Sequence, residues 1–273
     1  MKSVVRYSEI GLKSPQSRMS MERVLVRNIR ACVGDVKVIT GLGRIIVHSD
    51  DAESLSRVFG IASVSPAAEV AADMKEIKKA SLELYTGGSF RVSCRRITKD
   101  TKETSMDIMR DVGAYIQEKT GAKVDLENYN VEIGIEILRK RAYVFNTRIA
   151  GPAGLPLGTQ GKVARAFDGS GRAAAAAYLM MKRGVEVVPI GKESDAAKTI
   201  REKWAYGSSF DVENGDAADM ANERGCIGLV LSDELDLVEL TKIKRRTEML
   251  ILMPLLGYSD AEIKRIARLV TEK

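Results

Sequence analysis

Apolar residues recur along this chain with two periods, one typical of strands and one typical of helices. In the first part of the chain, this pattern predicts a small α+β unit. Residues 2–7 alternate as a strand does, and Ser14 followed by a proline is typical of a helix start. Apolar residues then recur at helical spacing to about residue 33. Two short apolar runs, 36–40 and 43–47, meet at a glycine and predict a hairpin. The opening segment is therefore predicted to be a β-α-β-β unit, a small sheet covered by one helix.

The following segment predicts a second α+β unit that contains an antiparallel meander. A short helix from Leu55 leads into an apolar strand over 61–70, where Pro66 indicates an edge strand or a bulge. The later elements come in the order helix, strand, helix, strand and strand, over residues 74–85, 89–95, 104–119, 131–138 and 141–147. A tight basic turn joins the last two strands.

A stretch rich in Gly and Pro, AGPAGLPLGTQG at residues 150–161, suits neither a helix nor a strand interior and indicates a junction between domains. Beyond it, strands are predicted at 163–167, 185–190, 208–212 and 227–231. Helices are predicted between them at 172–182, 194–204 and 216–223, and a last one at 260–270. This alternation predicts a doubly wound parallel sheet whose ligand chemistry lies at the carboxyl ends of its strands.

The net charge of +6 adds a second asymmetry, because all of it lies in the N-terminal half. Residues 1–150 contain 25 Lys and Arg against 19 Asp and Glu, whereas residues 151–273 contain 18 of each. Clustered positive charge gains affinity for a phosphate backbone by releasing its counterions, so this half is where we expect a polyanionic partner. A solvated basic surface is the alternative.

Several classes of protein are excluded by the cysteines, the histidine and the apolar runs. Cys32, Cys94 and Cys226 are odd in number, far apart and in no CxxC pair, which argues against a disulfide framework, a zinc site and export. No apolar run approaches the ~18 residues of a membrane span, and the opening residues lack the apolar core of a secretory signal. The single histidine, His48, follows a predicted strand and is interpreted as a surface residue. We expect a cytoplasmic protein without a membrane partner.

Three stretches together resemble one family. They are YSEIGLKS at residues 7–14, GPAGLPLGTQGK at 151–162 and YLMMKRGVEV at 178–187. In this order they are similar to segments of the tRNA 4-thiouridine synthetases, also called tRNA sulfurtransferases, some of which are linked to thiamine thiazole synthesis. The resemblance covers almost the whole chain and is far more specific than a lone GxGxxG. The chain is similar to a short, archaeal-type form of the family.

The resemblance implies a fold of mixed α/β and α+β class. It implies an N-terminal ferredoxin-like domain at 1–54, a THUMP domain at 55–150, the junction at 151–161, and a C-terminal domain at 162–273. This last domain would be a doubly wound parallel sheet of the PP-loop (adenine nucleotide α-hydrolase) type. The predicted order of strands and helices agrees with each of these expectations.

In the family the first two domains grip tRNA, mainly by its acceptor stem. Arg95-Arg96 followed by Lys99 is similar to the RR-x-x-K pattern at a strand end of the family, and Lys and Arg in such a loop can follow A-form phosphates. The RNA-binding residues implied are Lys13, Arg18, Arg91, Arg95, Arg96, Lys99 and Lys102. The alternative for these arginines is that their stems merely cover apolar neighbours.

The chain departs from the family at the nucleotide loop. An active PP-loop has SGGxDS after its first strand, and the equivalent residues here are Asp168, Gly169, Ser170, Gly171, Arg172 and Ala173. A carboxylate at Asp168 would face phosphate charge at a cost of ~1 to 4 kcal/mol near 4 Å, and Arg172 replaces the aspartate that would anchor Mg²⁺. Both glycines keep a turn at a helix start, and Arg172 can itself bind an anion. The loop is thus either a small-anion or altered nucleotide site over 168–172 or a vestigial turn.

The sulfur chemistry of the family also lacks its usual residues. Other members use a cysteine in a C-K-R-x-M stretch, and some add a rhodanese domain, but residues 211–224 contain no cysteine and no rhodanese domain is predicted. Residues 231–239 are only weakly similar to the TGxSLGQVASQT-type segment of the family. Cys226 lies between a helix and an apolar strand and is expected to pack in the core. No catalytic residue and no metal ligand is assigned.

Two functions therefore stay open. The first is a tRNA-binding module or subunit in tRNA thiolation (4-thiouridine formation), which presents tRNA to a separate catalyst or sulfur donor. The second is an active sulfurtransferase that adenylates a tRNA uridine with ATP and Mg²⁺. The resemblance also suggests a homodimer, and the apolar residues 249–256 are either a patch for it or a buried strand.

Overall fold

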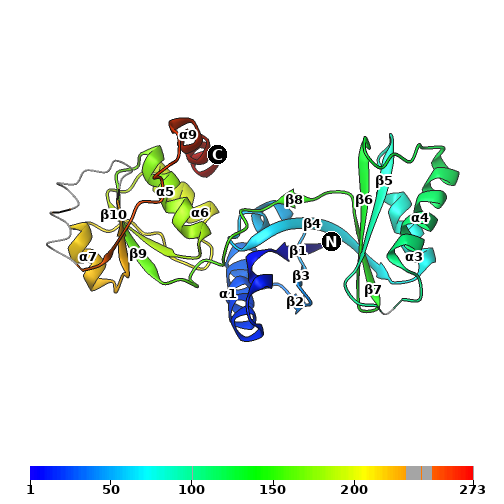
Figure 1. The fold of residues 1–273 in the computed structure, drawn as a ribbon, viewed down its shortest axis with the longest axis horizontal. Coiled ribbons are helices and arrows are strands. Elements are labelled where there is room, and N and C mark those ends of the chain that lie inside the picture. The colour runs from blue at the N-terminus through cyan, green and yellow to red at the C-terminus, as the bar shows by residue number, and fades with distance from the viewer. Residues whose placement is uncertain (100, 232–240, 242–247, 273) are drawn as a thin grey trace. The chain divides into compact units, whose positions relative to one another are not determined.

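The computed structural model describes residues 1–99, 101–231, 241 and 248–272, which belong to two compact units (Figure 1). Unit 1 comprises Met1–Arg6, Val36–Glu53 and Ser63–Ala150. Unit 2 comprises Tyr7–Asp35, Ser54–Ala62 and Gly151–Lys273. The first predicted domain therefore contributes its strands to unit 1 and its helix to unit 2.

Unit 1 is built on one mixed sheet with the strand order β2-β3-β1-β4-β7-β6-β5, and β8 pairs with β4. The pairs β1–β3, β2–β3, β4–β7, β4–β8 and β6–β7 are antiparallel, whereas β5 and β6 are parallel. The strands are β1 (Lys2–Tyr7), β2 (Val38–Gly41), β3 (Arg44–Val47), β4 (Ile61–Ala71), β5 (Phe90–Arg96), β6 (Val131–Leu138), β7 (Arg141–Phe145) and β8 (Ile149–Ala150). The predicted hairpin at 36–47 is confirmed.

Two helices, α3 (Met74–Glu83) and α4 (Ser105–Thr120), cover β5, β6 and β7 (Figure 1). Asp73 caps α3, and Thr104 begins α4 with a capping box, so both helices start where their side chains satisfy free backbone N–H groups. Ile77 of α3, Ile108 of α4 and Phe90 of β5 belong to the core between these layers. A short helix, α2 (Ala52–Leu55), precedes β4.

Of the two alternatives for Pro66, the edge strand is wrong, because β4 lies inside the sheet between β1 and β7. Residues Ser63 and Val64 pair with β8, and the pairing with β7 begins at Ala68. Pro66 thus falls between two ladder segments, where its missing N–H disrupts neither of them.

A buried ion cluster joins the strands of unit 1. Glu136 of β6 accepts hydrogen bonds from Arg6 Nε of β1 at 2.7 Å and from Arg44 Nε of β3 at 2.5 Å. Arg6 also donates to the hydroxyl of Ser65 and lies 4.8 Å from the ring centroid of Phe145. Burial opposes the charge of Glu136, but the hydrogen bond from Arg44 and the charges of both arginines outweigh it and lower the pKa of this carboxyl.

Unit 2 contains a four-stranded parallel sheet with the order β10-β9-β11-β12. Its strands are β9 (Lys162–Phe167), β10 (Glu186–Gly191), β11 (Gly228–Val230) and β12 (Leu250–Leu252). Its helices are η1 (Glu9–Leu12), α1 (Pro15–Val33), α5 (Gly171–Lys182), α6 (Asp195–Lys203), α7 (Ala217–Glu223) and α9 (Asp260–Thr271). Ser14 caps α1 as predicted, with Pro15 in the first turn.

Two predictions for this unit need revision. The strand expected at 208–212 is wrong, since the segment between α6 and α7 forms only an isolated bridge between Glu213 and Ile190. The apolar residues 249–256 include β12, which lies at the end of the sheet order, so this segment is only partly a buried strand. Leu255 is buried in the core, whereas Leu256 is 61% exposed.

The junction is a structured part of unit 2. The backbone N–H of Leu155 donates to Lys182 O, and that of Gly158 donates to Gly184 O, both at 3.0 Å. The side chain of Asn28 on α1 donates to Leu157 O at 3.0 Å. A Cβ at Gly154 would lie 1.9 Å from Lys182 O, which explains why a glycine is needed there. The junction therefore binds α1 to the end of α5.

None of the helices in the described part of the chain has the length and apolar character that crossing a bilayer requires. Residues 232–239, which belong to the segment with weak similarity to the TGxSLGQVASQT-type motif, lie outside the described residues.

The buried cluster predicts that Glu136→Gln destabilises unit 1 by about 3 to 5 kcal/mol, because it leaves two buried guanidinium groups without their counter-charge. Since folding lowers the pKa of Glu136, its stabilising effect should be complete above the unfolded-state pKa and be lost as pH falls through the folded-state pKa. Urea unfolding of both proteins from pH 7 to pH 3 measures this, with exposed Glu118→Gln as control. Equal stability of Glu136→Gln and the wild type at pH 7 would refute the role of the cluster.

Candidate nucleic-acid interface and nucleotide loop

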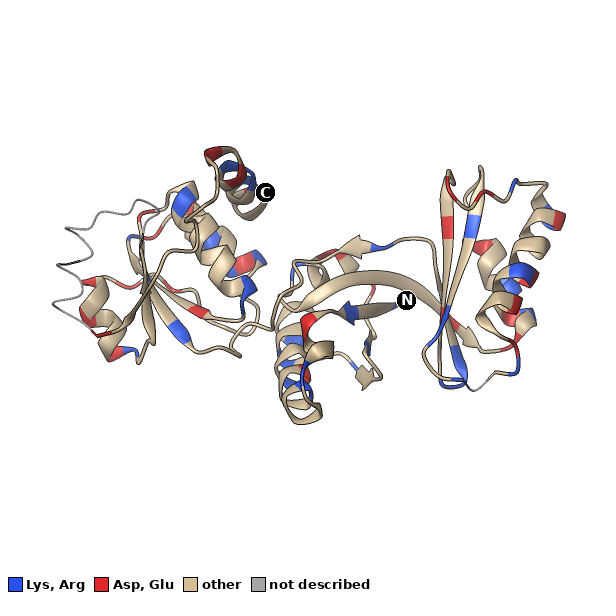
Figure 2. Cartoon of the chain, viewed as in Figure 1, with Lys and Arg blue, Asp and Glu red and all other residues tan. Residues whose placement is uncertain are grey.

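Exposed basic residues gather at one end of the sheet in unit 1. The backbone N–H of Arg139 donates to Thr98 Oγ1 at 2.6 Å, which places the β6–β7 turn beside the loop that follows β5. Figure 2 shows several Lys and Arg positions near the start of β7, whereas basic and acidic residues alternate on α4. We call this group the basic edge, and it comprises the exposed residues Arg95, Lys99, Lys102, Arg139, Lys140 and Arg141.

Two of the predicted RNA-binding arginines have partners inside unit 1. Arg91 forms an ion pair with Glu132 at 2.9 Å, and its guanidinium lies 4.1 Å from the ring centroid of Tyr129. Arg96 Nη1 donates to Thr101 O at 3.2 Å and to Glu103 O at 2.7 Å. Arg91 is therefore partly neutralised, and Arg96 shapes the loop on which Lys99 and Lys102 lie.

The other two predicted RNA-binding residues belong to unit 2. Lys13 follows η1 and is exposed, and Arg18 lies half-buried in the first turn of α1, where its N–H donates to Ser14 O. The seven predicted residues are thus divided between the two units. The structure adds Arg139, Lys140 and Arg141, for which the basic character of the turn was the available signal.

The loop after β9 is closed by its own side chains. The backbone N–H of Ser170 donates to Asp168 Oδ1 at 2.9 Å, and Ser170 Oγ accepts the N–H of Ala173 at 3.2 Å to cap α5. Hydrogen bonds from Ser170, chiefly from its side chain, lower the pKa of Asp168 against the effect of burial. An ionised carboxylate and a self-capped helix start therefore occupy the place where a PP-loop presents backbone N–H groups to phosphate.

Arg172, the fifth residue of this loop, forms an ion pair outside the loop. Its Nη1 forms an ion pair with Asp260 at the start of α9, at 2.8 Å. The two glycines keep the turn that the sequence predicts. A Cβ at Gly169, where φ is +78°, would lie 2.8 Å from Ser194 Cβ, and a Cβ at Gly171 would lie 3.0 Å from Ala267 Cβ. The turn is retained because the neighbouring chain approaches it closely.

These residues do not fit a nucleotide bound with Mg²⁺. The carboxylate of Asp168 accepts the N–H of Ser170, and no group of three or more His, Cys, Asp or Glu suited to a metal ion lies within the described residues. Hard cations such as Mg²⁺ need oxygen ligands, which the loop does not gather. We therefore assign no adenylation step to this loop.

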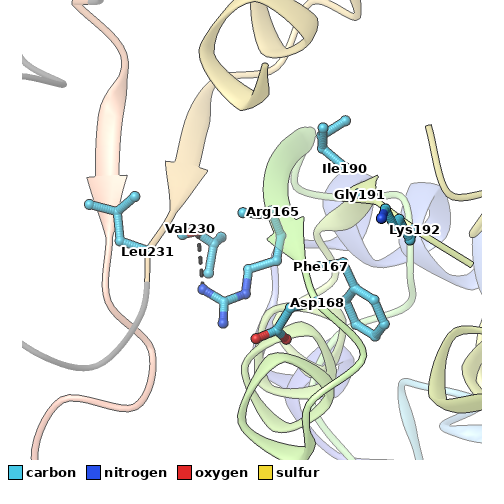
Figure 3. Close-up of a pocket in the computed structure, with 9 residues that line it drawn as sticks. Arg165, Phe167, Asp168, Ile190, Gly191, Lys192, Val230 and Leu231 are labelled. Atoms are coloured by element: carbon cyan, nitrogen blue, oxygen red, sulfur yellow. Dashed lines mark hydrogen bonds between the residues drawn. The ribbon is translucent and has the colours of Figure 1, made fainter. Parts of the chain in front are cut away.

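A pocket of about 510 Å³ opens beside this loop, at the carboxyl ends of β9, β10 and β11 (Figure 3). Arg165 of β9 extends into it although the residue is only 5% exposed, and its Nη1 donates to Val230 O at 3.3 Å. Its Nε has no hydrogen-bond partner among the described residues. Figure 3 shows the guanidinium pointing toward the carboxylate of Asp168. Sequence analysis missed Arg165, although an arginine inside an otherwise apolar central strand was a signal.

The three cysteines are free thiols, and two of them have raised pKa values. Burial raises the pKa of Cys94 to about 11, and it raises the pKa of Cys226 as well. Cys226 packs among buried apolar residues, as predicted. Thiols with raised pKa values are poor nucleophiles at neutral pH.

Comparisons with known proteins agree with this architecture. The ThiI ferredoxin-like domain matches residues 2–65, and the THUMP domain matches residues 69–146. The class of protein that the fold defines is therefore a ThiI-type ferredoxin-like domain followed by a THUMP domain and a parallel-sheet domain. The predicted fold class is confirmed.

A probable tRNA sulfurtransferase from Thermococcus kodakarensis is 34% identical over 97% of this chain and 86% of its own length. The crystal structure of PH1313 from Pyrococcus horikoshii has a TM-score of 0.84 at 34% identity and covers 98% of both chains. A 4-thiouridine synthetase, crystallised with RNA and bound ATP, has the same fold, with a TM-score of 0.83 at 24% identity over 98% of this chain and 84% of that one. This chain belongs to the tRNA sulfurtransferase family.

The share of each relative that is matched varies. The chain spans only about half the length of several other curated tRNA sulfurtransferases, between 50% and 52% of each.

The hydrogen bonds of Arg96 predict that Arg96→Ala loosens the loop between β5 and α4 without unfolding the sheet. Trypsin should then cleave after Lys99 and Lys102 several times faster than in the wild type, while the thermal midpoint changes little. Peptide mapping during limited proteolysis measures this, with Arg110→Ala, which breaks an exposed pair with Asp107, as control. Unchanged cleavage rates would show that Arg96 does not hold the loop.

Proposed function

We propose that this protein binds tRNA through its N-terminal half and serves tRNA thiolation as a tRNA-binding module or subunit, without adenylating tRNA itself. The observation that carries the proposal is the basic edge. Its residues are exposed, and the bond between Arg139 and Thr98 sets the two segments that bear them side by side. Lysines and arginines at such a spacing can contact successive phosphates of an A-form helix.

The self-capped loop after β9 supports the absence of adenylation. An adenylating loop must place N–H groups and a metal ion against the phosphates of ATP. Here the backbone N–H of Ser170 donates to the carboxylate of Asp168, and Arg172 is paired with Asp260. The 4-thiouridine synthetase of similar fold binds ATP, and ATP with Mg²⁺ would be the cofactors of this chain only if the loop rearranged.

The rest of the assembly is also a proposal. We infer domains at 1–54, 55–150 and 162–273 joined by the junction at 151–161, with a separate sulfur donor or catalytic partner that completes the reaction. We further infer a homodimer, for which the exposed Leu250 of β12 and the exposed Leu256 offer apolar contacts. A sedimentation profile with only a 29.9 kDa species would exclude the dimer.

The proposal predicts that the triple variant Arg95→Ala, Lys99→Ala and Lys102→Ala binds tRNA at least tenfold more weakly at low salt. Each lost phosphate contact should also lower the slope of log K against log[salt] by about 0.7 to 0.9. Fluorescence anisotropy with labelled tRNA at several salt concentrations measures both quantities. Binding that the triple variant leaves intact would overturn the assignment of the basic edge.

A matched control removes the same number of charges elsewhere in unit 1. The exposed lysines Lys75 and Lys79 of α3 and Lys119 of α4 can be replaced together by alanine. This control should retain nearly wild-type affinity. An equal loss in both triple variants would mean that total charge, and not a site, governs binding.

The absence of adenylation is tested separately, by tRNA-dependent exchange between ATP and pyrophosphate. We expect no exchange above background. Measured exchange would favour the alternative of an active ATP-dependent sulfurtransferase and would leave the tRNA-binding result unaffected.

A further inference from the structure

A second pocket of unit 2 lies at the C-terminal end of α5 and shares no lining residue with the pocket beside the loop after β9. Its volume of about 380 Å³ falls in the usual range for a small-molecule site, a size class that includes a single nucleotide. We call it the α5 pocket. Its lining comes from α5, from the C-cap of that helix and from the segment between β12 and α9, and consists of Leu179, Met180, Lys182, Arg183, Pro254 and Tyr258.

One side of the α5 pocket is apolar and carries an aromatic ring. Leu179 and Met180 are half-buried and pack against the core of unit 2, whereas Tyr258 is 41% exposed. The backbone N–H of Tyr258 donates to Leu255 O at 3.0 Å, and Leu255 is buried in the same core. The backbone of Tyr258 is therefore fixed to a core residue while its ring stays accessible. Such a ring can stack on a planar ligand.

The other side of the α5 pocket is positively charged. Lys182 is half-buried and Arg183 is exposed, and none of the described residues that line the pocket is acidic. Arg183 Nη1 donates to both carboxylate oxygens of Glu9 in η1, at 3.1 and 3.2 Å. The exposed Lys13 follows η1 directly, about 8 Å along that helix. The pocket and the helix bonded to it therefore present three cations.

An accessible aromatic ring with cations beside it is the chemistry by which proteins hold unpaired nucleotides. Bases that are splayed out of single strands and loops stack on aromatic side chains, and Lys or Arg contact the neighbouring phosphates. A fully paired double helix offers no free base face, because its bases are stacked on one another. The interaction of Lys182 with the helix dipole at the end of α5 explains a cation there, but it does not explain an accessible ring across the pocket.

We propose that the α5 pocket binds one unpaired nucleotide of the tRNA, with the base stacked on Tyr258 and Lys182 at a flanking phosphate. Arg183 is the weaker second cation, because Glu9 already pairs with it. The inference rests on the proposed binding of tRNA and adds a contact in unit 2 to the basic edge of unit 1. It involves no reaction at the loop after β9.

The test is fluorescence anisotropy of the full chain with two labelled RNAs, a tRNA and a blunt-ended duplex in which every base is paired. Tyr258→Ala should weaken tRNA binding at least fivefold, because the stacking surface for the base is lost. The same variant should bind the duplex as the wild type does. Tyr258→Phe keeps the ring and should retain wild-type affinity for both RNAs, so it is the matched control.

A charge variant tests the phosphate contact independently of the ring. Lys182→Ala should weaken tRNA binding and lower the slope of log K against log[salt] by about 0.7, the value for one phosphate of a single strand. Lys198→Ala removes an exposed charge from α6 and should change neither quantity. Thermal midpoints close to that of the wild type would show that the variants are folded.

Several results would overturn the assignment of the α5 pocket. Wild-type tRNA affinity in both Tyr258→Ala and Lys182→Ala would exclude a nucleotide there, and an equal loss for tRNA and duplex would exclude an unpaired one. Poly-glutamate binding that Tyr258→Ala weakens as much as tRNA binding would assign the pocket to an acidic peptide. A changed sedimentation profile of Tyr258→Ala with unchanged tRNA affinity would assign it to a second copy of the chain.

Failure of the proposed function gives a different result. In that case the wild type itself would bind no tRNA, and the inference would fall with it. If the wild type binds tRNA and the basic-edge triple variant weakens that binding, only the variants at Tyr258 and Lys182 decide whether the α5 pocket takes part.

Discussion

The carboxylate of Glu136 is the point on which the N-terminal half depends. It lies on β6, in the THUMP domain, and accepts hydrogen bonds from Arg6 on β1 and Arg44 on β3, both in the ferredoxin-like domain. Moving three charged groups out of water is costly, and the hydrogen bonds among them, together with those of Arg6 to Ser65 and of Arg44 to Gly43 O, offset the cost. The register of the shared sheet is therefore specified by charge as well as by apolar contacts. The same strand, β6, ends two residues after Glu136, and the basic turn with Arg139 follows directly.

The two halves of the chain use positive charge in different ways. In unit 1, Arg91 forms an ion pair with Glu132 and Arg96 donates to Thr101 O and Glu103 O. Lys99 and Lys102, which follow β5, are exposed. In unit 2, the loop residue Arg172 is paired, while the buried Arg165 keeps a donor without a partner in the described residues. An arginine near a candidate site is therefore available to a ligand only to the extent that its N–H groups are not already bonded within the protein.

Much of the fold could be predicted from the sequence because local signals and the overall architecture agree. Ser14 with the following proline marks the start of α1, and the alternation of strands and helices predicts the parallel sheet. Pro66 misled because its effect depends on where the partner strands end, which is a tertiary property. In the segment at 208–212, Phe210 and Val212 alternate with polar residues as in a strand, but the segment between α6 and α7 pairs only at Glu213.

The candidate sites were less predictable for a physical reason. A run of arginines in a strand does not show which of them face an acidic partner, so Arg91 and Arg95 look equivalent until Glu132 is placed beside Arg91. Similarly, the altered loop directed attention to Arg172, while the pocket brings in Arg165 and Lys192 from two different strand ends. Pairing across the sheet decides which charges are available to a ligand.

We propose that tRNA is held by the basic edge of unit 1 and not by the loop after β9. Amide hydrogen exchange of the full chain, compared with and without saturating tRNA, tests it most directly because it reports every segment at once. We expect slower exchange in residues 95–104 and 138–142 when tRNA is bound, with residues 166–173 unchanged. Protection confined to residues 166–173, or none in the β5–α4 loop and the β6–β7 turn, would contradict it.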